Sequence, residues 1–226
     1  MRKFLKLVAV LAFAATGQAS HATVEFDLNT VINGSTPSGL APWMTATFTS
    51  ISGGVSVELD NKMDPGEFIT NLAFNSLVNP TTLLFPGVLV LPMTSISASS
   101  GQVLNGDPSP KAGLFNIDIG LQTSNSGRFS GGTSVFFDIM GTGLSEDSFN
   151  MLSADGGPSN PGGWLMAAKV QGIPIPGSTD TTSGSIGFTN VSAVPEPKVY
   201  AMLGFGLALI GFFARRNRDS QHLATN

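Results

Sequence analysis

The chain has 226 residues, of which 42% are hydrophobic and only 12% are charged, and its formal net charge is −4. This length suits one domain with short terminal segments. Because cysteine is absent, disulfide bridges and thiolate metal sites are excluded.

The first segment has the three parts of a secretory signal peptide. Three basic residues open it, namely Arg2, Lys3 and Lys6. An apolar run over 7–15 follows, too short to span a bilayer, and small residues then lead to Ala22. We predict a signal peptide over residues 1–22, cut by signal peptidase between Ala22 and Thr23, with Ala19 as the second candidate site. The mature chain is therefore expected outside the cytoplasm.

Residues 23–193 consist of short apolar runs separated by Gly, Pro, Asn and Ser. In the first run Val24, Phe26 and Leu28 alternate with acidic residues, which is the period of a half-buried strand. Strands are predicted at 24–28, 43–51, 55–59, 68–77, 88–93, 115–121, 134–140, 164–170 and 185–191, and one short helix, capped by Ser145, at 145–152. The pattern predicts an all-β domain, a β-sandwich with a jelly roll as the nearest alternative.

This middle domain is acidic, with thirteen Asp and Glu residues against four Lys and Arg residues. Nucleic acid is therefore not expected as a partner, because phosphate binding needs basic side chains. Of the two histidines, His21 leaves with the signal peptide and His222 lies near the end of the chain. Without them the domain can form neither a Ser-His-Asp triad nor a histidine-ligated zinc site. No catalytic residue is predicted.

One predicted loop groups oxygen ligands as a calcium site does. Asp60, Asp64 and Glu67 lie close together in it, but Lys62 stands among them and the spacing departs from that of an EF-hand. A plain turn is the favoured alternative. Calcium is thus a candidate ligand, and no other cofactor is expected.

Spaced carboxylates also leave open a polysaccharide-cleaving enzyme, which needs two of them facing each other across the sugar. Three pairs qualify by spacing: Glu25 with Asp27, Glu58 with Asp60, and Asp64 with Glu67. The members of the first two pairs are two residues apart and so share a strand face, which does not imply a cleft. Solvated strand faces and turns are therefore the favoured interpretation.

The only two tryptophans, Trp43 and Trp164, are candidates for ligand contact, because sugar-binding sandwiches stack rings on such residues. Each stands at the start of an apolar predicted strand. A place in the core is therefore the favoured interpretation for both.

The last segment, residues 194–226, has three parts of its own. Pro195, Glu196 and Pro197 interrupt regular structure, because proline lacks the backbone donor. A run of uncharged, mostly apolar residues over 199–214 predicts a short transmembrane helix. Three arginines close the run: Arg215, Arg216 and Arg218. This basic cluster is expected to stay cytoplasmic, which places the preceding domain outside.

These three parts in this order resemble the PEP-CTERM sorting signal. The resemblance covers residues 194–218 and implies recognition by an exosortase, a membrane-embedded cysteine protease that removes the helix. It also implies a Gram-negative bacterium that makes extracellular polysaccharide, with transient residence in the inner membrane before transfer to the cell surface or biofilm matrix. It implies no activity for the domain ahead of the tail. An ordinary single-pass anchor that is never cut is the alternative.

Together these features predict a non-catalytic exported protein of the cell surface or extracellular matrix that binds polysaccharide or matrix proteins. The alternative is the carboxylate-dependent polysaccharide-cleaving enzyme described above.

Overall fold

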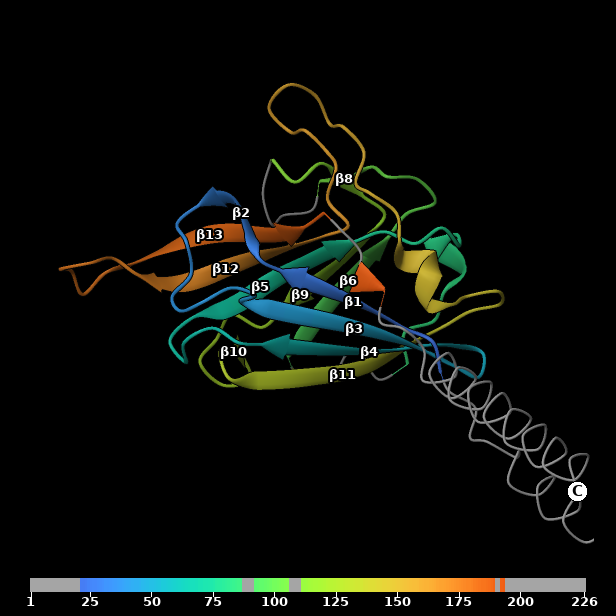
Figure 1. Ribbon diagram of the computed structural model, residues 1–226, viewed down its shortest axis with the longest axis horizontal. Coiled ribbons are helices and arrows are strands. Elements are labelled where there is room, and N and C mark those ends of the chain that lie inside the picture. Colours follow the sequence, from blue (N-terminus) through green and yellow to red (C-terminus); the bar gives the residue numbers. More distant parts are fainter. Residues whose placement is uncertain (1–20, 87–91, 106–110, 190–191, 194–226) are drawn as a thin grey trace, which may run out of the picture. The chain divides into compact units, whose positions relative to one another are not determined.

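The computed structural model describes residues 21–86, 92–105, 111–189 and 192–193. Ala22–Val194 form one compact unit. Its described strands pair antiparallel throughout (Figure 1), so the prediction of an all-β fold is confirmed.

The first sheet has five strands in the order β11-β4-β3-β1-β14. Their bounds are Thr133–Met140 (β11), Gly54–Asn61 (β4), Met44–Ile51 (β3), Thr23–Leu28 (β1) and Ser192–Ala193 (β14). β3 and β4 pair along their whole length, and β1 and β11 lie on either side of this pair. Along β1, Val24, Phe26 and Leu28 are buried, as their spacing predicts.

The second sheet has seven strands, of which six follow the order β2-β13-β12-β5-β9-β6 and β10 pairs with β5. Their bounds are Thr30–Gly34 (β2), Phe68–Phe74 (β5), Met93–Ala98 (β6), Ile117–Leu121 (β9), Phe129–Ser130 (β10), Met166–Pro174 (β12) and Thr181–Phe188 (β13). A separate short pair joins β7 (Leu104–Asn105) to β8 (Leu114–Phe115).

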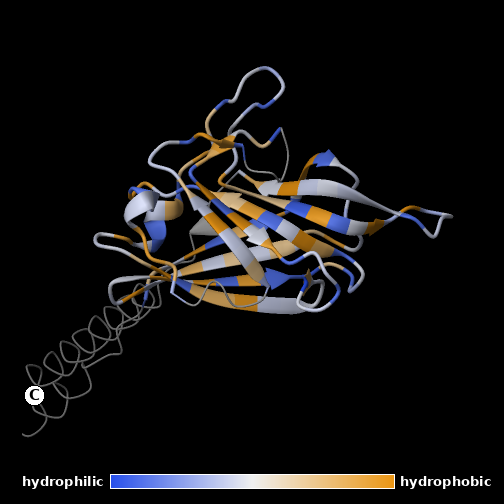
Figure 2. Cartoon of the chain, turned by 180° about the vertical axis from the view of Figure 1, so that it is seen from behind, coloured by the Kyte–Doolittle hydropathy of each residue, from blue (hydrophilic) through white to orange (hydrophobic). Residues whose placement is uncertain are grey.

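One apolar core lies between the two sheets and joins them. Phe48 on β3 contacts Phe74 on β5 with ring centroids 5.7 Å apart, and it contacts Phe149 at 4.6 Å. Phe26 on β1 and Phe188 on β13 are a second such pair, at 6.0 Å. The alternation of hydrophobic and hydrophilic residues along the strands is visible in Figure 2. Each sheet therefore packs one face against this core, and its other face lies outside the core.

A second, smaller cluster covers part of the outer face of the seven-stranded sheet. Ala73 on β5 and Ala167 on β12 are direct neighbours in the sheet, and Ala112 and Phe115 pack on them. Half-buried Trp164 lies against this cluster. The apolar cover stops at this end of β5 and β12, so the other end of the same face stays polar.

Several predicted boundaries differ from the structure. The strand expected at 68–77 ends at Phe74, because Asn75 and Ser76 form hydrogen bonds with Asn116 in place of ladder bonds. β2 was not predicted at all, and of the strand expected at 88–93 only 92–93 are described, where Met93 begins β6.

The helix expected at 145–152 is corrected to one 3₁₀ turn, Glu146–Phe149. Ser145 and Ser148 cap each other's backbone at its start, as the sequence predicts for Ser145. Phe149 is fully buried in the core against Phe48, which stops the turn from continuing as an exposed helix.

The C-terminal elements lie outside the described residues. This applies to the transmembrane helix expected at 199–214, to Pro195–Pro197 and to the arginine cluster. Within the part of the chain that the structure describes, no helix combines the length and apolar character needed to cross a membrane.

Candidate ligand-binding site

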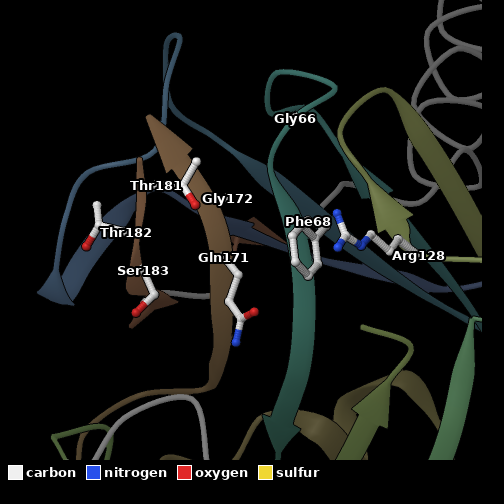
Figure 3. A pocket seen from close by; sticks show the side chains of 8 residues that line it. All are labelled: Gly66, Phe68, Arg128, Gln171, Gly172, Thr181, Thr182 and Ser183. Atoms are coloured by element: carbon white, nitrogen blue, oxygen red, sulfur yellow. The ribbon is translucent and has the colours of Figure 1, made fainter. Parts of the chain in front are cut away.

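A pocket of about 550 Å³ lies on the outer face of the seven-stranded sheet, at the end that the small cluster leaves uncovered. Its lining residues come from β5 and the loop before it, from β12 and β13, and from the segment before β10 (Figure 3): Gly66, Phe68, Arg128, Gln171, Gly172, Thr181, Thr182 and Ser183. Ile69 and Val170 point into the core, so their neighbours Phe68 and Gln171 point outward into the pocket.

Three neighbouring strands place their side chains in one row across the pocket. Phe68 on β5 is the register partner of Gln171 on β12, and Gln171 is the partner of Ser183 on β13. Direct partners on adjacent antiparallel strands have Cβ atoms about 5 Å apart. The row therefore brings an aromatic ring, an amide and a hydroxyl within reach of one small ligand.

A β-bulge shapes the wall of the pocket. The register of β12 against β13 shifts between Gln171 and Ile173, which leaves Gly172 without a partner. Gly172 has a φ of +78°, and a Cβ there would lie 2.3 Å from the carbonyl oxygen of Gly66. Only glycine allows both this backbone conformation and this approach. The Gly66 loop therefore lies close against β12 at this position.

Arg128 lies over the ring of Phe68, with its guanidinium carbon 3.9 Å from the ring centroid (Figure 3). Its Nε donates a hydrogen bond to the carbonyl of Thr123 at 2.8 Å. The next residue, Phe129, is fully buried and pairs with Ile69, which anchors the arginine beside β5. Among the described residues, nothing accepts a hydrogen bond from the two terminal guanidinium nitrogens. The guanidinium group is therefore held in place, while its two terminal nitrogens remain available to donate hydrogen bonds to a ligand.

The remaining polar groups of the pocket are uncommitted. The amide of Gln171 and the hydroxyls of Thr181, Thr182 and Ser183 form no side-chain hydrogen bond with any described residue. None of the lining residues carries a carboxylate. Several free donors and acceptors and one cation thus face the same small volume.

Glu67 lies between two lining residues but points the other way. Its side chain is fully buried, and Oε1 accepts a hydrogen bond from the backbone N–H of Ser38 at 2.9 Å. Its second oxygen is buried without a partner among the described residues. Glu67 therefore ties the loop before β3 to the start of β5.

The structure does not bring the three carboxylates of the calcium candidate together. Asp60 accepts a hydrogen bond from Ser134 on the outer face of the five-stranded sheet, and Asp64 is exposed. Glu67 is drawn into the interior by the Ser38 amide, away from both. Within the described ranges, no three His, Cys, Asp or Glu side chains form a group that could hold a metal ion.

The two tryptophans lie away from the pocket. Trp43 is only 7% exposed and belongs to the main core, and no described residue accepts a hydrogen bond from its buried indole nitrogen. Trp164 is half-buried against the small outer cluster. The structure thus places Trp43 in the core, as the favoured interpretation had it, and Trp164 against the small outer cluster, and neither ring lines the pocket.

Four of the carboxylates considered for catalysis share the outer face of the five-stranded sheet. Glu25 and Asp27 lie on β1, Glu58 and Asp60 lie on β4, and β3 runs between them. Asp27 accepts a hydrogen bond from Thr45, to which Lys62 also donates, at 3.0 and 2.6 Å. The pocket contains none of these four.

The predicted signal cleavage site lies at the edge of the described residues. Thr23 begins β1, and its hydroxyl is 3.3 Å from that of Thr49. The carbonyl of Ala22 accepts a hydrogen bond from Ser50 at 2.9 Å. Cleavage after Ala22 would remove this acceptor, whereas cleavage after Ala19 would retain it.

The pocket residues were not predicted from the sequence, although two signals were present. Gly172 interrupts an apolar strand pattern, which is typical of a bulge. Arg128 is one of only four basic residues in an acidic domain. Neither signal identifies Gln171 or Ser183, whose meeting depends on strand register.

No protein-family model matches the chain, and no solved structure matches it. The chain is 31% identical over 151 residues to a protein of Escherichia coli (strain K12) named "Uncharacterized lipoprotein YdeK". The match covers 65% of this chain but only 11% of the length of that relative.

Proposed function

We propose that this protein is an exported, non-catalytic protein of the bacterial cell surface or extracellular matrix, and that its β-sandwich domain binds extracellular polysaccharide in the pocket around Gln171. One observation carries the proposal. The amide of Gln171 and the hydroxyl of Ser183 face one pocket without hydrogen-bond partners among the described residues. Sugars offer rows of hydroxyl groups that such donors and acceptors satisfy.

The size and position of the pocket support this ligand class. A volume of about 550 Å³ lies in the range of small-ligand pockets. The pocket lies on a sheet face and not inside the core, so a polymer can pass across it while a few sugar units make contact. Paired-carboxylate hydrolysis needs two acids at the site. The lining residues include none, which favours binding over cleavage.

The proposed route to the surface depends on the two ends of the chain. Signal peptidase removes residues 1–22, and the helix at 199–214 then holds the domain on the outer side of the inner membrane. An exosortase-type protease recognises the Pro195–Pro197 motif and releases the domain. The lipoprotein name of the E. coli relative supports export, although the sequence match spans a small part of that protein.

The test is retention on polysaccharide. The full-length protein is produced in its bacterium, and the mature form is run in native gels that contain extracellular polysaccharide from the same strain. We expect the mobility of the wild type to fall as polysaccharide is added, and Gln171→Ala with Ser183→Ala to weaken the interaction about tenfold, since two hydrogen bonds are lost.

Ser56→Ala is the matched control for this test. Ser56 lies on β4, on the outer face of the other sheet, and its side chain makes no hydrogen bond with any described residue. It should retain wild-type affinity. Equal retention of wild type and double variant would disprove the role of the pocket, and no retention of any form would disprove polysaccharide binding.

A further inference from the structure

From Arg128 we infer that the pocket selects acidic polysaccharide, with a carboxylate of the sugar chain bound by the guanidinium group. This inference rests on the proposed function and adds the chemical class of the ligand.

The first argument concerns charge. The domain carries thirteen acidic residues against four basic ones, so its general field repels anions. The pocket is an exception, because Arg128 is its only ionised lining residue. A cation without a carboxylate partner among the lining residues provides the main attraction for an anionic ligand in this region.

The second argument concerns geometry. Two contacts orient the guanidinium group, namely the Nε hydrogen bond to Thr123 and the stacking on Phe68. Neither contact uses the outer edge formed by the terminal nitrogens. This edge matches the two oxygens of a carboxylate, which arginine binds through parallel hydrogen bonds. Because the side chain is already ordered, little conformational entropy is lost when the anion binds.

The third argument excludes the usual alternative for sugar binding, ring stacking. Phe68 is only 6% exposed, because Arg128 covers its face. A neutral sugar therefore finds no open aromatic platform in this pocket. Recognition must come from the cation and from the polar side chains of Gln171 and Ser183, which lie farther along the row.

The experiment compares two forms of one polymer. Polygalacturonate carries a carboxylate on each sugar, and its methyl ester has the same backbone without the charge. Affinity electrophoresis of the mature wild-type protein should show at least tenfold stronger retention by polygalacturonate than by its methyl ester. The preference should weaken as sodium chloride rises, because salt screens exposed charges.

Three variants test the residue itself. Arg128→Gln should lose about tenfold or more of the affinity for polygalacturonate, in line with the strength of charged hydrogen bonds. Arg128→Lys should recover part of the loss, because it keeps the charge without the planar fork. Lys62→Gln is the charge-matched control on the other sheet and should bind like the wild type. Thermal unfolding of each variant identifies any loss of fold.

The outcomes separate this inference from the proposed function. Equal retention by both polymers, together with an Arg128→Gln variant that binds like the wild type, overturns the selection of acidic sugars but leaves polysaccharide binding intact. This comparison stands even if Arg128→Gln unfolds, since the two polymers are compared on the wild-type protein. Loss of all retention, by these polymers and by the native polysaccharide, overturns both.

Discussion

At the scale of single residues, Gly172 has the most specific role. Its positive φ and its contact with Gly66 exist together only because it lacks a Cβ. The same residue forms the bulge in β12 directly after Gln171, which lines the pocket. Packing and site geometry are therefore coupled at this position.

We expect Gly172→Ala to destabilise the protein by about 2–4 kcal/mol, because backbone strain and a clash with the Gly66 carbonyl add together. Gly177→Ala is the matched control. Gly177 has the same φ of +78°, but a Cβ there would meet no atom within 4 Å, so only strain of about 1 kcal/mol is expected. Urea unfolding measures both free energies. Equal losses for the two variants would show that the Gly66 contact contributes nothing.

At the scale of elements, β3 and β5 hold the two sheets together. Phe48 and Phe74 meet edge to face across the core, and Phe149 from the 3₁₀ turn closes the group. The edge strand β11 has the opposite character at Phe136, which is 66% exposed. The position of a phenylalanine in its strand thus decides how much its side chain contributes to the free energy of unfolding.

We expect Phe48→Ala to lower the free energy of unfolding by about 3–5 kcal/mol, the cost of a large core cavity. Phe136→Ala should change it by less than about 0.5 kcal/mol, as exposed substitutions do. Urea titrations followed by tryptophan fluorescence provide the comparison, because Trp43 lies in the same core. A large loss for Phe136→Ala would mean that β11 is covered by a partner.

At the scale of the whole molecule, the charge is divided between the parts of the chain. Seven of the eleven basic residues lie in the two terminal segments, and the domain between them is acidic. If both terminal segments are removed, the released domain carries a net charge of about −9 by residue count. Such a charge favours solubility outside the cell and leaves Arg128 as the local exception in the pocket.

We expect two mature boundaries, a start at Thr23 and an end near Pro197, with the helix at 199–214 removed. Intact-mass measurement of the protein from culture fluid and from membranes reads both ends at once. Replacement of Glu196 by Ala should shift the protein to a membrane-bound form that extends to Asn226. A wild-type protein that stays in membranes with Asn226 present would instead establish the permanent anchor.

The sequence alone determined the all-β class and most strands, because alternation with period two reports which face of a strand is buried. The absence of cysteine excluded disulfide bridges and thiolate metal sites from composition alone. The helix over 145–152 was wrong because the local pattern does not report that Phe149 is held in the core. The export and sorting signals remain predictions from the two ends.

Only the tertiary structure decided where the polar groups meet. Phe68, Arg128, Gln171 and Ser183 lie in separate segments of the chain, and strand register brings them together. The same applies to Glu67 and Trp43, which local sequence marked as candidate ligand contacts and packing placed inside. The pattern of residues along a strand encodes which face is buried. Which side chains lie next to one another on that face depends on hydrogen bonds between strands that are distant in the chain, and a binding site consists of such neighbouring side chains.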